Sequence, residues 1–572
     1  MRLDLFQKFY YSLGQNKIKD EIYNMKNRYA HKSILGNTAV FALITVATLF
    51  ITENLHAQIV DRPRPQEWDQ LVMGGRFMDR ILPMPEGNKG EKVWGVEEVA
   101  GRFIDNGIES PETSFWGGNI LKGEDGLYHL YVCGWPENSP KGHMFWPNST
   151  VYHAVSEKLS GPYTVRQAIG KGHNPEAFVL DDGRIVIYVI DGYYIADSYE
   201  GPWKYGHFEF DQRDRNIIEG LSNLTFAKRN DGSRLMVCRG GGVWISRDGL
   251  SPYRQITEKR IYPPVKGEFE DPVVWKDELQ YHLIVNDWLG RIAYYLRSLD
   301  GVHWVVEQGE AYVPGVSVHP DGYVEKWFKY ERPKVFQDQE GRVIQMNFAV
   351  IDTIKWEDLP NDNHSSKNIC LPMNKGLLME VLNESPINEN TGKIEVLIKG
   401  EENFNPAEEL ELSSLRFGSY NKVNFGKGSK ALGMKAKGKD LIITFDGTDN
   451  GIDANEFAPK LIGKNKKGEM VFGYAKLPYL DYKPAILSSL KPRYNDELKQ
   501  IEITVENFGL SASKESKLEL KTTDGTVFSA QLPSLEPYGK TTLKLDTGDA
   551  VKLEGCELTI TASDKILHQQ KW

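Results

Sequence analysis

The sequence predicts an all-β protein: a five-bladed β-propeller followed by two β-sandwich domains of the immunoglobulin-like type. Two observations lead to this prediction. Five segments of similar pattern begin about 50 to 60 residues apart, and internal repeats of this length indicate propellers or related arrays. Beyond Pro386 the repeat stops, and short strands separated by charged turns continue to the end of the sequence.

Each repeated segment opens with a polar or aromatic anchor, followed by alternating apolar residues, a polar turn that usually contains Asp and Gly, and a second apolar strand. The anchors begin at Trp116, His173, Ser222, Glu270 and Glu331. Asp-Gly between alternating apolar residues is a strong hairpin signal, and a second hairpin follows in several segments. Two hairpins form a four-stranded sheet, and five such sheets bury their faces best by packing radially. An extended array of sandwiches is the alternative.

The N-terminal part has the pattern of a secretory signal. Residues 34–51 are apolar, follow a basic stretch and precede the small residue Ala57, which together predict a signal peptide cleaved before Gln58. A membrane anchor is the alternative, because the apolar run is barely long enough to span a bilayer. In either case we expect the remaining chain to lie outside a bacterial membrane, whether secreted, periplasmic or on the cell surface.

Composition shifts divide the sequence into four predicted parts. They are residues 1–57 (extension and signal peptide or anchor), 58–385 (propeller), 386–483 (first β-sandwich) and 484–572 (second β-sandwich). The last part resembles the CARDB-like immunoglobulin-fold modules of secreted bacterial proteins through VENFGLSASKESKLELK and LPSLEPYGKTTLKL. This resemblance implies a spacing or binding role for that part.

The net charge argues against a nucleic-acid-binding protein, and the cysteine spacing argues against a zinc site or a CxxC motif. The net charge is −10 and the pI is near 5.8, whereas nucleic-acid binders present a basic face, so we expect no nucleic-acid partner. The cysteines match no zinc spacing and form no CxxC pair. They are Cys133, Cys238, Cys370 and Cys556. We predict that they are buried free thiols.

In a propeller the first strand of each sheet begins beside the central axis, so the five anchors converge at one end. The converging polar residues include Trp116, Asn119, His173, Glu176, Glu219, Ser222, Asn223, Glu268, Glu270, Asp271, Glu331 and Arg332. Glycoside hydrolysis needs one carboxylic acid and one carboxylate close together, and crowded carboxylates raise the pKa of one of them. Indoles offer stacking walls for sugar rings, and the candidates are Trp116, Trp135, Trp146 and Trp288.

The repeat pattern and acidic anchors of residues 105–382 resemble the secreted five-bladed glycoside hydrolases of family 43 and their relatives in family 117. In the family 43 pattern a Glu followed by Gly is the general acid, which matches Glu219 followed by Gly220. An Asp-Pro pair carries the base in the first repeat of that family. Here Asp271 precedes Pro272 in the fourth repeat instead, and the first repeat has no such carboxylate.

The resemblance implies roles for individual residues. We predict Glu219 as the acid and Asp271 as the base, with Glu176 and Glu270 as the competing catalytic carboxylates. The predicted substrate-binding residues are Trp116, Asn119, His173, Glu270, Trp288 and Arg332. His173 is also an alternative acid, because family 117 uses a histidine there. Arg332 suits a bidentate clamp on a carboxylate or sulfate, which points to an acidic or sulfated polysaccharide of algal or plant origin.

Structural alternatives remain open for these residues. An Asp before a strand commonly caps a turn, Glu331 and Arg332 could form an internal ion pair, and His173 could serve only as a hydrogen-bonding residue of the fold. The leading function is a secreted glycoside hydrolase that acts on a polysaccharide or its oligosaccharides. The alternatives are a non-catalytic glycan-binding propeller and a lyase of uronic acids. No metal-ligand spacing is evident, although the acidic cup could bind a structural calcium ion.

Overall fold

The computed structural model describes residues 59–90, 99–217, 221–250, 252–362, 364–563 and 565–572. The predicted signal segment and Glu219 lie outside the described residues. The all-β prediction is confirmed, because the helices of the described residues are all short. They are η1 (Gln66–Gln70), η2 (Phe77–Arg80), η4 (Gly142–Asn148), α3 (Pro406–Glu409), η5 (Leu412–Ser414) and α4 (Tyr420–Val423). Within the described part of the chain, no helix has the length and apolar character needed to cross a membrane.

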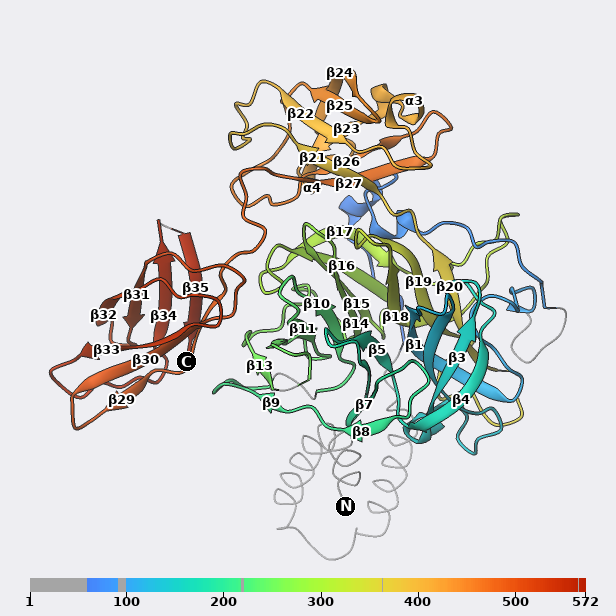
Figure 1. Ribbon diagram of the computed structural model, residues 1–572, viewed down its shortest axis with the longest axis horizontal. Helices are drawn as coiled ribbons and strands as arrows, with labels where there is room; N and C mark the ends of the chain where they lie inside the picture. Colours follow the sequence, from blue (N-terminus) through green and yellow to red (C-terminus); the bar gives the residue numbers. More distant parts are fainter. Residues whose placement is uncertain (1–58, 91–98, 218–220, 251, 363, 564) are drawn as a thin grey trace, which may run out of the picture. The chain divides into compact units, whose positions relative to one another are not determined.

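Five sheets, numbered I to V, follow one another along the chain (Figure 1). Sheet I contains β1 (Thr113–Lys122), β2 (Tyr128–Pro136), β3 (Thr150–Ser156) and β4 (Thr164–Lys171). Sheet II contains β5 (Glu176–Val179), β6 (Ile185–Val189), β7 (Gly192–Ala196) and β8 (Lys204–Gly206). Sheet III contains β10 (Thr225–Lys228), β11 (Arg234–Val237), β12 (Val243–Ser246), β13 (Tyr253–Gln255) and β9 (Phe210–Asp211), the last parallel to β13.

Sheet IV contains β14 (Phe269–Lys276), β15 (Tyr281–Asp287), β16 (Ile292–Ser298) and β17 (Val305–Tyr312). Sheet V contains β18 (Lys329–Gln337), β19 (Val343–Ile351) and β20 (Ser366–Pro372). Every predicted anchor lies inside the first strand of its sheet or a few residues before it. The predicted hairpin periodicity therefore matches the strand pairing of the structure.

The first strands of the sheets lie side by side: β1 contacts β5 and β18, while β14 contacts β10 and β18 (Figure 1). Side chains join them. Asn119 on β1 donates to the carbonyl of Ala177 on β5 (2.7 Å) and accepts from its backbone N–H (2.6 Å). Thr225 on β10 accepts from the backbone N–H of Val274 on β14 (3.1 Å). Buried polar side chains thus serve as bridges between sheets.

One backbone feature recurs at all five anchors. Gly117, Asn174, Asn223, Asp271 and Arg332 have φ values of 60°, 53°, 50°, 55° and 51°, in the left-handed region that non-glycine residues seldom adopt. In sheets I, IV and V the strand register shifts at this point, which marks a β-bulge, a feature that re-aims side chains. All five residues line one narrow cavity, so the five sheets converge there.

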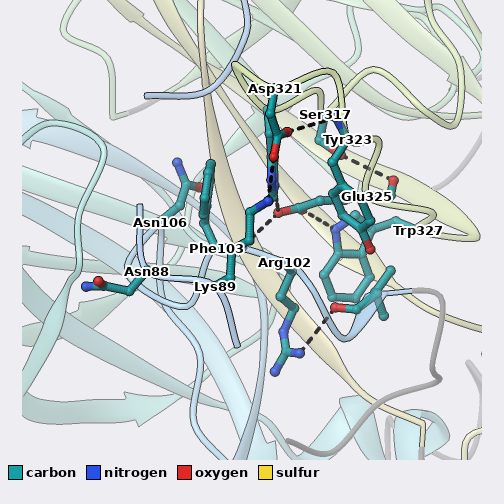
Figure 2. Close-up of polar contacts among 12 residues, drawn as sticks. Asn88, Lys89, Arg102, Phe103, Asn106, Ser317, Asp321, Tyr323, Glu325 and Trp327 are labelled. Carbon is teal, nitrogen blue, oxygen red and sulfur yellow. Dashed lines mark hydrogen bonds and ion pairs between the residues drawn. The ribbon is translucent and has the colours of Figure 1, made fainter. Parts of the chain in front are cut away.

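The N-terminal segment extends sheet V, which has three strands of its own. Ile108 and Asn368 exchange backbone hydrogen bonds (3.1 and 3.2 Å), and Ile81 forms a bridge with Met373. Figure 2 shows the adjoining polar contacts, in which Glu325 accepts from the backbone N–H of Phe103 (3.0 Å) and from the indole N–H of Trp327 (2.7 Å). The segment that precedes β1 is therefore fixed to the last sheet.

The next part of the chain is a closed barrel, which corrects the prediction of a β-sandwich over residues 386–483. Its strands are β21 (Leu377–Val381), β22 (Ile394–Ile398), β23 (Arg416–Gly418), β24 (Ser429–Lys437), β25 (Asp440–Phe445), β26 (Lys460–Lys464) and β27 (Met470–Lys476). The sequence boundary at Pro386 placed β21 in the propeller. In the structure β21 pairs in parallel with β27, and this long-range pairing closes the sheet. Strand alternation looks the same in a sandwich and in a barrel, so the pattern could not reveal the closure.

Two further four-stranded sheets share one apolar core at the C-terminus. Their strands are β28 (Leu487–Ser489), β29 (Arg493–Asn495), β30 (Gln500–Asn507) and β33 (Lys540–Asp546) in one sheet, and β31 (Ser516–Lys521), β32 (Val527–Leu532), β34 (Glu557–Ala562) and β35 (Lys565–Lys571) in the other. The assignment of this part to CARDB-like modules stays a prediction.

Candidate active site

Charged residues from sheets IV and V meet beside the five left-handed residues. We call Glu270, Asp271, Lys329, Glu331, Arg332 and Lys355 the axial cluster. Arg332 donates its backbone N–H to Asp271 Oδ2 (3.1 Å), pairs with Asp271 through Nη1, and places Nη2 3.7 Å from Glu270 Oε1. Asn223 of sheet III donates to Glu270 (3.2 Å) and Asp271 (3.3 Å). The structure thus brings together anchors that lie far apart in the sequence.

Asp271, the predicted base, is sealed inside this cluster. Its side chain is 0% exposed. Burial raises the pKa of Asp271 to about 6, with Glu270 and Glu331 acting in the same direction and Arg332 against them. Asp271 lines the narrow cavity, but its carboxylate is paired with Arg332 as a counter-charge. The assignment of Asp271 as the base stays a prediction.

The adjacent Glu270 is the carboxylate of the axial cluster that solvent reaches, with a side chain that is 14% exposed. Burial by itself would raise its pKa, but the guanidinium groups of Arg239 (3.5 Å) and Arg332 (3.7 Å) outweigh that effect and lower the pKa of Glu270. Glu270 is therefore an ionised carboxylate at neutral pH. That is the state required of a general base or a nucleophile.

Glu331 is held between two lysines. Lys329 donates to Glu331 Oε1 (2.8 Å) and Lys355 pairs with the other carboxylate oxygen. The Lys355 ammonium also lies 5.2 Å from the ring centroid of Trp116 and 6.0 Å from that of Trp288. Sequence reasoning missed Lys355 because it follows β19 in a polar loop, where a lysine carries no distinguishing signal.

His173 lies at the same site in a neutral form. Burial lowers the pKa of His173 well below its usual value, and the positive charge of Arg332 acts in the same direction. A histidine that acts as a general acid must carry a dissociable proton at the working pH, so the low pKa argues against the alternative in which His173 is the acid. Trp146 lies beside it, with ring centroids 4.8 Å apart.

Two predicted site residues join neighbouring sheets. Glu176 accepts from Thr225 (3.2 Å) and from the backbone N–H of Phe226 (3.1 Å) and pairs with Lys334, so its carboxylate is occupied in joining three sheets. Asn119 forms the bridge between β1 and β5 described above. Both side chains are engaged in contacts between sheets, and the assignments of Glu176 as a catalytic residue and Asn119 as a substrate-binding residue stay predictions.

The tryptophans predicted to stack against sugar rings differ in their exposure. Trp116 and Trp135 are each 1% exposed and pack around His143, so they belong to the core. Trp146 and Trp288 are partly exposed. Arg332 pairs with Asp271, whereas Glu331, its partner in the alternative left by the sequence, pairs with Lys329 and Lys355. The stacking prediction therefore stands for two of the four indoles.

A second acidic group lies where η4 meets the loop that follows β19. Burial raises the pKa of Asp358 to about 8, and the negative charges of Glu137 and Asp362 add to this effect. The Asp358 carbonyl lies so close to Gly142, which has a φ of 51°, that an added Cβ would sit 1.7 Å from the carbonyl oxygen. Glycine at this position therefore allows the loop that carries Lys355 to pack against η4.

Two predictions concern metals and thiols. All four cysteines are buried and free, which confirms the thiol prediction. Among the described residues no group of three or more His, Cys, Asp or Glu side chains is arranged to hold a metal ion. The option of a structural calcium ion stays a prediction.

No protein-family model and no curated protein matches the sequence. Solved structures similar to this chain include glycoside hydrolases. An α-L-arabinofuranosidase from Lactobacillus brevis shows 12% identity over 46% of this chain and 91% of that chain, with a TM-score of 0.32. An endo-arabinase from Bacteroides thetaiotaomicron shows 12% identity over 46% and 94%, with a TM-score of 0.29. A thermostable family-43 glycoside hydrolase shows 13% identity over 55% and 96%, with a TM-score of 0.31. Likeness at this level carries no inference about activity.

Proposed function

We propose that this protein is a secreted glycoside hydrolase with a five-bladed propeller, acting on an acidic or sulfated polysaccharide or its oligosaccharides. One observation carries the proposal: Glu270, a partly exposed carboxylate, directly precedes Asp271, which lines the cavity where the five sheets converge. Support for the blade count comes from the five left-handed anchors around one cavity. Support for secretion comes from the N-terminal apolar run.

The chemistry needs two groups on opposite sides of the scissile bond. Glu270 suits the ionised role, as a base that activates water or as a nucleophile. Glu219 remains our proposed acid on the strength of its Glu-Gly pattern. Trp146 and Trp288 are partly exposed and supply flat surfaces on which sugar rings could stack.

The charge of the site supports an acidic substrate. Lys355 of the axial cluster and Arg239, which pairs with Glu270, are each 15% exposed at the side chain. Cationic side chains at the opening of a pocket attract anionic ligands and hold carboxylate or sulfate groups. Uronic acids and sulfated sugars carry such groups.

The test is a screen of sulfated and uronic-acid-rich polysaccharides, read by chromatography of the products. We expect Glu270→Gln and Glu219→Gln each to lower the rate by at least about 100-fold, the size of effect typical of a lost catalytic group. Glu268→Gln is the matched control, because Glu268 is an exposed carboxylate two residues from Glu270. Full activity in both variants would rule out the proposal.

A second candidate is a glycan-binding propeller without catalysis. It is favoured by the burial of Asp271 and Glu331, both 0% exposed at the side chain, which leaves Glu270 as the accessible carboxylate within the axial cluster. This candidate predicts saturable binding with no release of reducing ends. A lyase would reveal itself in the same screen through the absorbance of an unsaturated product.

A further inference from the structure

The side chain of His173 has a defined set of neighbours. It precedes β5, is 7% exposed, and lies between Trp146 and Trp135, whose ring centroids are 4.8 and 6.1 Å away. Its Nδ1 atom lies 2.8 Å from Ser149 Oγ and 3.4 Å from Cys133 Sγ. Which atom donates in each contact depends on which ring nitrogen carries the proton.

Both neighbours of Nδ1 use their own proton elsewhere. Ser149 Oγ donates to the carbonyl oxygen of Trp146, and Cys133 Sγ donates to that of Trp116 (2.8 Å). A hydroxyl or thiol group has a single proton to donate. When the Ser149 hydroxyl donates to the Trp146 carbonyl, it accepts from Nδ1, and that nitrogen then carries the proton.

The other nitrogen, Nε2, is then a hydrogen-bond acceptor. A neutral imidazole has one N–H and one lone pair, and burial together with Arg332 keeps the pKa of His173 low enough for the neutral form. Among the described residues Nε2 has no hydrogen-bond partner. Nδ1 of His143 is a buried atom without a partner among the described residues, whereas His173 as a residue is 7% exposed.

We propose that His173 is fixed as the Nδ1–H tautomer by Ser149 and accepts, through Nε2, a hydrogen bond from a sugar hydroxyl lying against Trp146. This inference rests on the proposed glycan-binding site and assigns His173 as a specificity residue. A site built to pair with a substrate hydroxyl strongly rejects an analogue that lacks it. His173 thus selects for a hydroxyl at one position of the ring.

The tautomer is tested without turnover, on the protein that begins at Gln58 with ¹⁵N-labelled histidine. We expect NMR to show the proton of His173 on Nδ1 at neutral pH. Ser149→Ala removes the acceptor of that proton and should allow the Nε2–H form to appear. His207 is the internal control, because it is exposed and its Nδ1 pairs with the carbonyl of Asp191. A proton on Nε2 in the unsubstituted protein would overturn the inference.

The ligand is tested with pectin-derived and carrageenan-derived oligosaccharides, which represent uronic and sulfated sugars. Calorimetry measures binding, and the same NMR experiment should show the Nε2 signal of His173 shift while that of His207 stays in place. His173→Leu should weaken binding at least about tenfold and His173→Gln, which keeps an acceptor, should weaken it less. Binding with an unchanged Nε2 signal contradicts this inference alone. No binding from either source contradicts it together with the proposed function.

Discussion

Two buried ionic clusters in this protein have similar composition but different environments. The axial cluster joins sheets IV and V through Asp271 and Arg332. The second, which we call the seam cluster, consists of Arg297, Glu307, Lys460 and Tyr474 and joins sheet IV to the barrel. The carboxylate of Glu307 pairs with Arg297 Nε (2.5 Å) and Lys460 Nζ (3.2 Å) and accepts a hydrogen bond from the Tyr474 hydroxyl (2.8 Å). The side chains of Arg297 and Lys460 are each 0% exposed, and that of Glu307 is 2% exposed.

The difference lies in access and in backbone conformation. Although burial opposes it, Lys460 and Arg297 lower the pKa of Glu307 to about 2, and both carboxylate oxygens have partners. In the axial cluster Glu270 keeps some exposure, and Asp271 and Arg332 adopt left-handed backbone. Unusual backbone conformations concentrate at functional sites. A buried ion pair alone is therefore a poor sign of function. A partly exposed ion pair beside residues with left-handed backbone is a better sign.

The largest expected effect is on the seam cluster. Glu307→Gln removes the charge that two buried cations need, and breaking such a pair costs about 3–5 kcal/mol. Urea denaturation should show a fall of that size in the free energy of unfolding. Glu340→Gln, at a side chain that is 45% exposed, is the control and should change little. A loss below about 1 kcal/mol would mean that the seam cluster is not the structural lock inferred here.

The axial cluster should respond in the opposite way. Glu270→Gln keeps the shape of the side chain, and its site is partly exposed, so we expect a smaller fall in the free energy of unfolding than for Glu307→Gln. The hydrolysis rate should fall by about 100-fold or more. Paired measurements of denaturation and turnover on one preparation check this. Equal losses of stability in both clusters would remove the contrast between them.

A smaller effect concerns pH and Asp358. Its pKa is raised to about 8 in the folded protein and is about 3.9 in the unfolded chain, so the folded state holds a proton that the unfolded state loses. The stability that protonated Asp358 contributes is therefore fully present below about pH 4 and is lost as the pH rises through about 8. Asp358→Asn resembles the protonated form and should be more stable than the natural protein by about 1 kcal/mol or more at pH 9.

Thermal denaturation at several pH values tests the predicted direction of this pH dependence. The advantage of Asp358→Asn should disappear near pH 4, where the unfolded carboxyl also begins to bind protons. An advantage of the same size at every pH would show that removing the Asp358 charge is not its cause.

The smallest effect is expected at the surface. Lys544 and Glu502 lie 3.7 Å apart with side chains 55% and 35% exposed, and exposed pairs of this kind contribute little. Lys544→Ala should leave the urea midpoint unchanged within error. A clear loss would show that ion pairs in this protein act in ways that burial does not explain.

The sequence predicted where the anchors are but not which of their side chains face the site. Glu176 and Glu270 are both glutamates at the start of a repeat. Glu176 meets Thr225, Phe226 and Lys334, whereas Glu270 meets two arginines and solvent. The direction of each side chain depends on the local bulge and on neighbours from other sheets, which a one-dimensional pattern does not contain.

By itself, the sequence determined the strand content and the five repeats of this protein, because hairpins are encoded locally by alternation and Asp-Gly turns. It also determined that the cysteines are free, since no pairing pattern exists among them. Only the tertiary structure decided that Asp271 is sealed, that Lys355 reaches the axial cluster, and that β21 closes a barrel with β27. Each of these depends on contacts between residues far apart in the chain, and burial and charge pairing are properties of those contacts.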